Sequence, residues 1–401
     1  MTPATTDQDD GSLATARELL VDLVSIPSPS GQEAAAAERL VAFFEAHGRE
    51  VWIDEVGNVR APADDALLLT SHVDTVPGDI PVRVTEPDGE DDGAVLWGRG
   101  SVDATGPLAA MAVAAVRTGV SFAGVVGEET DSRGARHLVA DRAEPEALVN
   151  GEPSGADGIT LGYRGLCAGS CTISTPSRHS SRPEPNAIQR AMKWWSRVET
   201  DLEALTSSDE PDTASPFESV TAKPVAIDGG PTDDGLAVDA TLDFQLRVPP
   251  AVSIETVREP VESRSDEFGG AIEWTDAIRP VMASPRTPVA RAFRAAIRAE
   301  GADPRLLRKT GTSDMNVYAA AWACPMVTYG PGDAALDHAP DEHLSLAAFD
   351  RSIAVLERVG RTLATADESD SQPDDHPTNA TRPPREHHPT TQPSTADGEL
   401  P

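Results

Sequence analysis

The sequence is poor in cysteine and in lysine, and it has no long apolar run. Three cysteines in 401 residues are too few for a disulfide framework of the kind that stabilises small secreted domains. No stretch of 18 consecutive apolar residues occurs, so we expect no transmembrane helix. Residues 1–12 lack the basic and apolar segments of a secretory signal, which indicates a cytoplasmic protein.

Positive charge of any kind is scarce. The chain has 33 Lys and Arg residues, only three of them lysines, against 66 Asp and Glu residues, and its formal net charge is −33. A negative field of this size repels nucleic acid and anionic membranes, so we expect neither as a partner. The charge favours adaptation to a salt-rich cytoplasm over a specific cationic partner, because molar salt shortens the Debye length to about 3 Å and screens self-repulsion.

What the chain does contain is enough apolar sequence for a large core. Hydrophobic residues make up 39% of it, and its length allows two domains. We expect disorder at residues 1–12 and 365–401, which are polar and poor in large apolar side chains. Between these ends, short apolar runs alternate with amphipathic stretches. This predicts an α/β domain with a doubly wound, mostly parallel sheet, formed by residues 13–162 and 279–364.

Residues 163–278 follow a different pattern. Six predicted elements succeed one another in the order β-α-β-β-α-β, at residues 166–174, 186–205, 219–227, 240–248, 253–265 and 271–276. This order is that of the ferredoxin-like α+β plan, so we predict an inserted domain of that kind. Cys167 and Cys171 lie four residues apart in its first strand, and we interpret them as small core residues in preference to a metal clip.

Residues that commonly bind metal ions follow four predicted buried strands of the larger domain. The strands are expected at residues 66–71, 121–126, 147–150 and 325–329, and the residues that follow them are His72, Glu128, Glu129, Glu152 and His338. Ligands bind at the carboxyl ends of the strands in an open α/β sheet, so we expect these side chains to converge. Singly, each could be a surface or capping residue. Together they favour a metal site.

Two aspartates fit the same site. Asp103 stands at the tip of a Gly-rich loop, before a predicted helix, and could either cap that helix or bridge two cations. Two cations about 3.5–4 Å apart activate water and polarise a carbonyl group. Asp74 lies two residues after His72 and could accept the second imidazole N–H, which would fix the orientation of the ring.

The segments around these residues resemble the co-catalytic zinc deacylases and exopeptidases. This family includes acetylornithine deacetylase, succinyl-diaminopimelate desuccinylase and glutamate carboxypeptidase. The resemblance covers about residues 15–360 and is carried by residues 71–77 (SHVDTVP), 98–103 (GRGSVD), 127–129 (GEE) and 336–338 (LDH). It implies an enzyme that hydrolyses amide bonds with two divalent metal ions per subunit, zinc in the first place and cobalt as a substitute.

The resemblance also implies which residues hold the two ions. His72 and Glu152 would bind one ion, and Glu129 and His338 would bind the other. Asp103 would bridge the two. The imidazole and carboxylate donors of this set suit zinc, and cobalt or manganese could substitute for it.

Three further residues acquire catalytic roles from the resemblance. Asp74 would orient His72. Glu128 would be the general base, which takes a proton from water and passes it to the leaving amine. His179, in the inserted domain, would reach the active site of the neighbouring subunit, so the resemblance implies a homodimer.

The resemblance implies four substrate contacts as well. Arg247 would bind the carboxylate of the substrate, a task that suits the two-pronged guanidinium group. Gly311 and Thr312 would form a loop that faces the substrate. Asn186 would lie nearby, at the start of a predicted helix.

A closer resemblance narrows the substrate. Residues 150–155 (NGEPSG), 161–165 (LGYRG), 309–316 (KTGTSDMN) and 328–332 (TYGPG) look like the branch that releases lysine or ornithine from an amino-group carrier protein, in lysine and arginine biosynthesis. The carrier would then be the partner. The alternatives are an acetylornithine deacetylase, a dipeptide exopeptidase, or a non-catalytic amino-acid-binding scaffold. The presence of Glu128 with all five ligands favours an enzyme.

Overall fold

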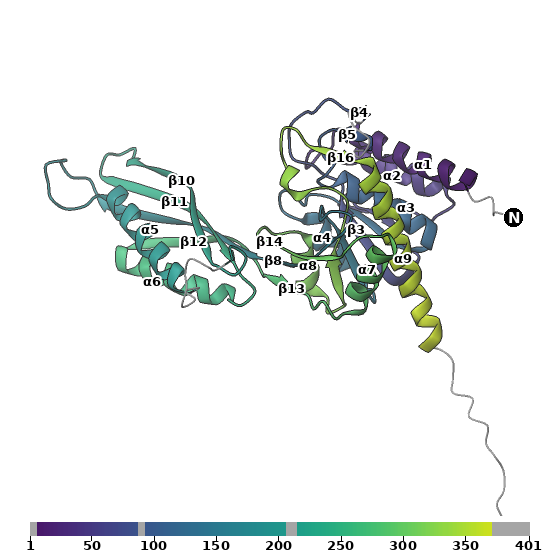
Figure 1. Cartoon of the computed structure of the whole chain (residues 1–401). Coiled ribbons are helices and arrows are strands. Elements are labelled where there is room, and N and C mark those ends of the chain that lie inside the picture. The colour runs from purple at the N-terminus through teal and green to yellow at the C-terminus, as the bar shows by residue number, and fades with distance from the viewer. Residues whose placement is uncertain (1–5, 87–92, 206–214, 371–401) are drawn as a thin grey trace, which may run out of the picture.

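The computed structural model describes residues 6–86, 93–205 and 215–370, without the side chains of residues 6–12 and 365–370. Figure 1 shows two bodies joined by a narrow neck, and the smaller body is the insertion between β8 and β13. The fold is therefore α/β with an inserted α+β unit, as predicted. Among the described residues, no helix is long and apolar enough to cross a membrane.

Within the described residues, nine strands form the sheet of the larger body. They are β1 (Trp52–Ile53), β2 (Val59–Ala61), β3 (Asp64–His72), β6 (Val120–Val125), β7 (Leu148–Gly151), β8 (Gly158–Tyr163), β13 (Val281–Met282), β14 (Arg305–Lys309) and β15 (Met326–Thr328). Their order is β1-β2-β6-β3-β7-β15-β8-β13, with β14 beside β8. The central strands β6, β3, β7 and β15 run parallel, whereas the pairs β2–β6 and β15–β8 are antiparallel.

Helices cover both faces of this sheet because successive residues of the central strand β3 point to opposite sides. Leu67 and Leu69 belong to the core beneath α1 (Thr6–Val24), α2 (Ala34–Ala46), α3 (Thr105–Thr118), α7 (Pro288–Ala299) and α9 (Leu346–Asp370). Leu68 belongs to the opposite core, beneath α4 (Arg133–Asp141) and α8 (Asp314–Ala321). A run of apolar residues, here Ala66–Leu69, whose members alternate between two cores is typical of a doubly wound sheet.

A small antiparallel sheet lies beside the larger one. Its described strands are β4 (Arg83–Thr85), β5 (Val95–Trp97) and β16 (His343–Ser345), in the order β16-β5-β4. The ring of Trp97 on β5 stacks on the ring of His343 on β16, with 4.4 Å between the centroids. This sheet joins the start of α9 to the chain that leads into α3.

The insertion has the predicted order of elements. It comprises β9 (Gly165–Pro176), α5 (Ala187–Ala204), β10 (Thr221–Pro231), β11 (Ala237–Val248), α6 (Ile254–Phe268) and β12 (Gly270–Ile278). Outside residues 206–214, its four strands form an antiparallel sheet in the order β10-β11-β9-β12. Its separate core contains Trp194 and Phe244, and Cys167 and Cys171 are buried in it, which confirms their interpretation as core residues.

The chain passes between the two bodies at Arg164 and Arg279, and two side chains hold these crossings. The guanidinium group of Arg164 donates hydrogen bonds of 2.9–3.2 Å to the carbonyl oxygens of Thr310, Pro216 and Ser219 and to Thr221 Oγ1. The amide of Asn316 donates to the carbonyl oxygens of both crossing residues, at 3.2 Å to Arg164 and 2.8 Å to Arg279.

Three helix boundaries differ from the sequence-based expectation. Helix α1 begins at Thr6, inside residues 1–12, which we expected to be disordered, and acidic residues in its first turns favour a helix N-terminus. The sequence pattern predicts a helix over residues 31–47, but α2 begins at Ala34 and not at Gly31, because Gly31 has φ of +88° and is not helical. Helix α9 continues to Asp370, six residues into the predicted tail, and residues 371–401 lie outside the described residues.

Candidate metal centre

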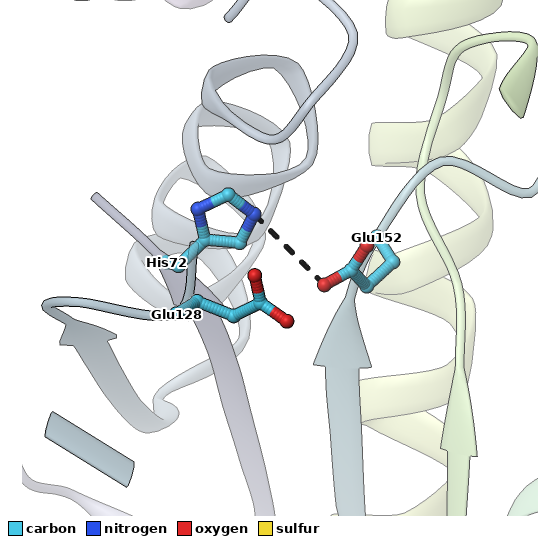
Figure 2. A group of neighbouring side chains, drawn as sticks. All are labelled: His72, Glu128 and Glu152. Atoms are coloured by element: carbon cyan, nitrogen blue, oxygen red, sulfur yellow. Dashed lines mark ion pairs between the residues drawn. The ribbon is translucent and has the colours of Figure 1, made fainter. Parts of the chain in front are cut away.

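The predicted metal-binding residues meet at the carboxyl end of the central parallel strands. His72 is the last residue of β3, Glu128 and Glu129 follow β6, and Glu152 follows β7. Because β6, β3 and β7 are neighbours in the sheet, their ends bring these side chains together. Figure 2 shows the imidazole of His72 and the carboxylates of Glu128 and Glu152 pointing toward one common space.

Asp103 lies at the centre of the cluster, with one carboxylate oxygen toward each histidine. Its Oδ1 is 3.1 Å from His72 Nε2, and its Oδ2 is 3.2 Å from His338 Nε2. Glu152 Oε1 lies 3.9 Å from the same nitrogen of His72, and Glu129 Oε1 lies 3.1 Å from that of His338. Each histidine thus has its own glutamate, and the two pairs share Asp103.

The ligand atoms are close enough to hold metal ions. One oxygen or nitrogen atom from each of His72, Glu128 and Glu152 lies within 4.8 Å of the others, and the same is true of His72, Asp103 and Glu129. Glu128, our candidate for the base, therefore lies as close to His72 as the expected ligand Glu152 does, within the same 4.8 Å limit. The geometry of these groups alone does not separate a ligand from a base.

Crowding and burial of negative charge shift the pKa values of the cluster. Burial raises the pKa of Glu152 to about 8, and the charge of Asp103 adds to this effect. Burial, together with the charge of Glu152, raises the pKa of Glu128 well above its usual range. Burial also raises the pKa of Asp337 to about 7. These carboxylates can all be ionised at neutral pH only if a further positive charge joins them.

The pKa values of the two histidines of the cluster are raised as well. The hydrogen bond to Asp103 and the charge of Glu129 raise the pKa of His338 to about 9, although burial opposes the shift. A metal ion must displace the proton from each imidazole, and its charge also restores the carboxylates to their ionised form. Two imidazoles among several carboxylates form a donor set that fits divalent zinc, cobalt or manganese.

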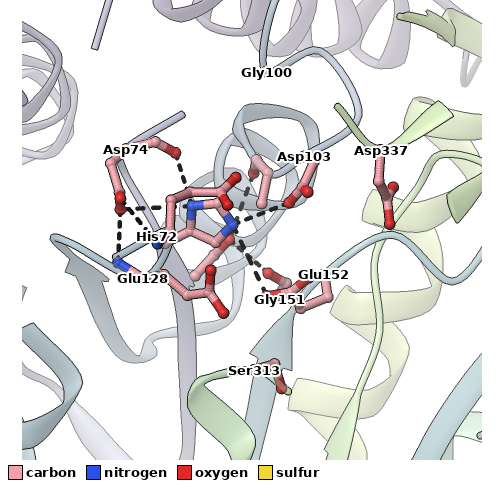
Figure 3. A network of polar contacts seen from close by, with 12 residues as sticks. His72, Asp74, Gly100, Asp103, Glu128, Gly151, Glu152, Ser313 and Asp337 are labelled. Carbon is pink, nitrogen blue, oxygen red and sulfur yellow. Dashed lines mark hydrogen bonds and ion pairs between the residues drawn. The ribbon is translucent and has the colours of Figure 1, made fainter. Parts of the chain in front are cut away.

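The carboxylate of Asp74 has different partners from those we expected. The expectation was a hydrogen bond from the His72 imidazole, but His72 Nδ1 lies 2.8 Å from the main-chain oxygen of Asp74 and 3.7 Å from its Oδ1. The carboxylate instead accepts hydrogen bonds of 3.1 Å from the main-chain N–H groups of Glu128 and Glu129 (Figure 3). Asp74 orients His72 through its backbone and fixes the glutamate loop through its side chain.

Glu342 is a residue of this site that the sequence analysis missed. Its side chain is fully buried and accepts hydrogen bonds of 2.8–3.1 Å from the main-chain N–H groups of Gly100, Val102 and Asp103. It also pairs with Arg99, whose Nη1 lies 2.8 Å from Glu342 Oε2. The four contacts hold the loop that carries Asp103. The separation of about 240 residues leaves no local signal for this pairing.

The same loop requires glycine at position 100. Gly100 has φ of +80°, and a Cβ atom there would lie 2.6 Å from Thr75 Cγ2 and 2.7 Å from Thr105 Oγ1. The left-handed conformation and the close approach both exclude a side chain. Gly100 of the Gly-rich loop is therefore needed for the close packing of the segment that carries Asp103.

Lys309 is a second residue that the sequence analysis did not assign to the cluster. Its Nζ lies 3.9 Å from Glu152 Oε2 and 3.6 Å from Asp337 Oδ2. Lys309 is one of only three lysines in the chain, which could have marked it in advance. Its ammonium group partly offsets the negative charge around Glu152.

The expected substrate contacts lie outside the cluster and only partly together. Arg247 Nη1 lies 3.4 Å from Thr312 Oγ1, so the insertion meets the loop that contains Gly311. Asn186 instead caps helix α5, since its side chain accepts the N–H of Gln189. His179 is exposed, and its imidazole bonds only to Ser181 in the same loop, among the described residues. Within this single chain, neither Asn186 nor His179 contacts the cluster.

The chain matches known proteins over most of its length. The model of the peptidase family M20/M25/M40 matches residues 68–362. The chain is 37% identical to a [LysW]-lysine hydrolase of Deinococcus radiodurans, over 85% of this chain and 95% of that protein. It is 31% identical to a [LysW]-lysine/[LysW]-ornithine hydrolase of Sulfurisphaera tokodaii, over 82% of this chain and 90% of that protein.

Solved structures agree on the fold. A tripeptidase of Staphylococcus aureus superimposes with a TM-score of 0.71 at 20% identity, over 88% of this chain and 99% of that one. A protein of Bacillus subtilis, described as a dinuclear metal-binding peptidase of the M20 family, superimposes with a TM-score of 0.62 at 14% identity, over 89% and 98% of the two chains. From the matched residues and the shared fold, this chain belongs to the peptidase family M20/M25/M40 and is a hydrolase of that family.

Proposed function

We propose that this protein is a metal-dependent amide hydrolase that releases lysine or ornithine from an amino-group carrier protein. The observation that carries the proposal is Asp103, whose two oxygens face two different histidines, each with its own glutamate. This arrangement suits a pair of bridged cations and has no evident purpose in a binding scaffold. The names of the relatives, with 31–37% identity over most of the chain, support the substrate.

The residues of the cluster divide into two sets around Asp103. His72 and Glu152 would hold one divalent ion and Glu129 and His338 the other, with zinc as our first choice and cobalt as a substitute. When bound, such a pair of ions lowers the pKa of water and polarises the carbonyl group of the substrate. All five residues lie at one edge of the sheet of this chain, so the proposed site needs no other chain to supply a ligand.

Glu128 is our choice for the general base. Its side chain points into the space between His72 and Glu152 (Figure 2). The carboxylate accepts a proton from the attacking water, the oxygen of that water bonds to the carbonyl carbon, and the C–N bond breaks. Glu128 then delivers the proton to the leaving amine nitrogen. Asp74 holds the main chain of Glu128 in place for both transfers.

Arg247 and the loop of Gly311 and Thr312 are our candidates for binding the released amino acid. The hydrogen bond between Arg247 and Thr312 places a guanidinium group at the junction of the insertion with the larger body. Such a group can bind the carboxylate of lysine or ornithine with two hydrogen bonds. Asn186 keeps a capping role in this chain and is a weaker candidate.

We propose that the protein acts as a homodimer in which His179 serves the active site of the partner. His179 is exposed on the insertion, where it has no contact with the cluster of its own chain. The edge strand β10 and the turn that follows it expose Val225, Ile227 and Leu236, at 56%, 56% and 73%. Exposed apolar side chains on an edge strand suit a contact with a second copy.

Replacement of the base should separate catalysis from metal binding. We expect Glu128→Gln to lower kcat at least about 100-fold, the usual contribution of a general base, and to leave the metal content unchanged. His72→Ala should instead lose metal, because it removes a ligand. Elemental analysis and initial rates measure both effects. Retention of most of the activity by Glu128→Gln would refute the assignment.

Removal of the contact between Glu342 and the loop that carries Asp103 should weaken metal binding, although Glu342 is not itself a metal ligand. We expect Glu342→Gln to lower metal affinity about 10- to 100-fold, because an amide cannot accept all four hydrogen bonds and Asp103 loses its fixed position. Metal titration and the visible absorption of the cobalt-substituted protein report the effect without reference to activity.

The matched control for that variant is Asp54→Asn. Asp54 is also a buried carboxylate that accepts main-chain hydrogen bonds, at 3.2 Å from Val56 and 2.9 Å from Asn58, and it pairs with Arg60. It does not contact the metal cluster. The melting temperature of both variants should be lower than that of the unmodified protein, but only Glu342→Gln should bind metal more weakly. Equal metal affinity in the two variants would show that Glu342 is purely structural.

A substrate panel distinguishes the proposed activity from an acetylornithine deacetylase or a dipeptide exopeptidase. We expect carrier-linked lysine or ornithine to be hydrolysed at least about tenfold more efficiently than N-acetylornithine, which corresponds to roughly 1.4 kcal/mol of transition-state binding. The comparison uses kcat/KM at matched salt, with a dipeptide as a third substrate. A preference for N-acetylornithine would make the protein a deacetylase.

Complementation tests the dimer. We expect His179→Ala and Glu128→Gln to be inactive alone and to regain partial activity when their subunits exchange, because the hybrid contains one site with both residues intact. Size-exclusion chromatography with light scattering gives the mass of each preparation. A fully active monomeric His179→Ala protein would exclude the shared site.

A further inference from the structure

The chain contains three tyrosines, and all three are buried in the larger body. The hydroxyl group of Tyr318 lies 3.0 Å from Thr70 Oγ1. That of Tyr329 donates a hydrogen bond of 2.9 Å to the main-chain oxygen of Ala156. The hydroxyl group of Tyr163 is buried as well, but it has no hydrogen-bond partner among the described residues. Tyr163 therefore carries a buried donor that the fold itself does not use.

The missing partner of this hydroxyl group calls for a physical explanation. A buried hydroxyl that has left water and has no partner in the protein destabilises the fold, and nearly all such groups in proteins are satisfied. Phenylalanine would place the same ring at position 163 without this penalty. The hydroxyl group therefore points to an acceptor that joins it in another state of the site.

The surroundings of Tyr163 contain such an acceptor. Tyr163 is the last residue of β8, directly before the crossing into the insertion, and its ring lies in the core beneath α8. The hydroxyl groups of Ser313 and Thr328 lie beside its own, but neither is positioned for a hydrogen bond to it. Burial raises the pKa of Tyr163 well above its usual range, and the charges of Glu152 and Glu128 add to this effect. The hydroxyl thus stays protonated beside the carboxylates of the metal cluster.

Glu152 shows the complementary deficit, because it is an acceptor without a donor. Its carboxylate accepts no hydrogen bond from the described residues, and the nitrogen atoms that face it, His72 Nε2 and Lys309 Nζ, both lie 3.9 Å away. The other two expected carboxylate ligands, Asp103 and Glu129, each lie 3.1 Å from an imidazole nitrogen. Glu152 is therefore the expected carboxylate ligand whose orientation the described contacts fix least.

We propose that Tyr163 is a positioning residue of the metal site, whose hydroxyl group donates a hydrogen bond to the carboxylate of Glu152 when that carboxylate binds a metal ion. The proposal rests on the proposed function, because Glu152 is a ligand only if the cluster holds metal. A carboxylate that binds an ion through one oxygen can accept a hydrogen bond at the other, and such a partner fixes its orientation. A neutral hydroxyl does so without the repulsion that an ammonium group exerts on the ion.

A purely structural role for the same hydroxyl group makes a different prediction. If the hydroxyl stabilised the fold through Ser313 and Thr328, its removal would destabilise the metal-free protein. If it waits for the metal-bound form of Glu152, its removal relieves a buried donor without a partner, and the metal-free protein becomes no less stable. The melting temperature of the metal-free protein therefore separates the two roles.

The experiment compares Tyr163→Phe with the matched control Tyr329→Phe in the full chain. Without metal, we expect the melting temperature of Tyr163→Phe to equal or exceed that of the unmodified protein. That of Tyr329→Phe should be lower, because the main-chain oxygen of Ala156 loses its donor. In titrations with Co²⁺, followed by visible absorption, Tyr163→Phe should bind one of two ions about tenfold more weakly. Tyr329→Phe should bind cobalt as the unmodified protein does.

Turnover gives a third measurement. We expect kcat of Tyr163→Phe to fall, whereas KM should stay within about twofold, because the buried hydroxyl does not touch the substrate. Unchanged cobalt affinity in Tyr163→Phe would overturn the proposal. So would a metal-free melting temperature that falls as far as that of Tyr329→Phe. Failure of the unmodified protein to bind cobalt at all would instead refute the proposed function.

A measurement on the unsubstituted chain applies if Tyr163→Phe folds poorly. Fluorotyrosine replaces the three tyrosines, and fluorine NMR of Tyr318→Phe and Tyr329→Phe assigns their signals. We expect the addition of zinc to shift the signal of Tyr163 more than that of Tyr329. A Tyr163 signal that moves no further than the Tyr329 signal would overturn the proposal.

Discussion

The site depends on one electrostatic constraint, the accumulation of carboxylates at a buried edge of the sheet. Among the described residues, Asp103, Glu128, Glu129, Glu152 and Asp337 face the imidazoles of His72 and His338 and the ammonium group of Lys309. Such an excess of negative charge is unstable in a low-dielectric environment unless cations join it or protons neutralise it. The fold supplies the rigidity that keeps these groups together, through buried contacts at Asp74 and Glu342.

The parts of this structure that follow from local sequence were predictable. Short apolar runs located the central strands, and the position of His72, Glu129 and Glu152 just beyond them placed the cluster, because parallel strands end at a common edge. The order of elements in the insertion followed from the same alternation. The family resemblance, confirmed by the match over residues 68–362, added the substrate class, which neither periodicity nor charge could provide.

The parts that depend on distant contacts were not predictable. The Asp74 carboxylate could accept hydrogen bonds from the imidazole of His72 or from the N–H groups of the glutamate loop. Which donors it bonds depends on the path of that loop, which the sequence does not show. In the sequence, nothing distinguishes Glu342 from the other acidic residues of this acidic chain. The four groups that donate hydrogen bonds to it belong to a segment about 240 residues away. Asn186 caps helix α5, and its role in substrate binding stays a prediction, because the sequence does not distinguish a helix cap from a substrate ligand at such a position.

The junction at Arg164 and Arg279 ties the two bodies together through one side chain. The amide of Asn316 bonds to both chain crossings, so a single residue of the larger body couples the path into the insertion to the path out of it. Asn316 also stands in the first turn of α8, three residues after the loop end at Ser313 that meets the cluster side of the sheet. The loop with Gly311 and Thr312 therefore lies beside this junction. Arg247 comes from the insertion and Thr312 from the larger body, so the proposed substrate-binding group is assembled from both bodies at the point where Asn316 joins them.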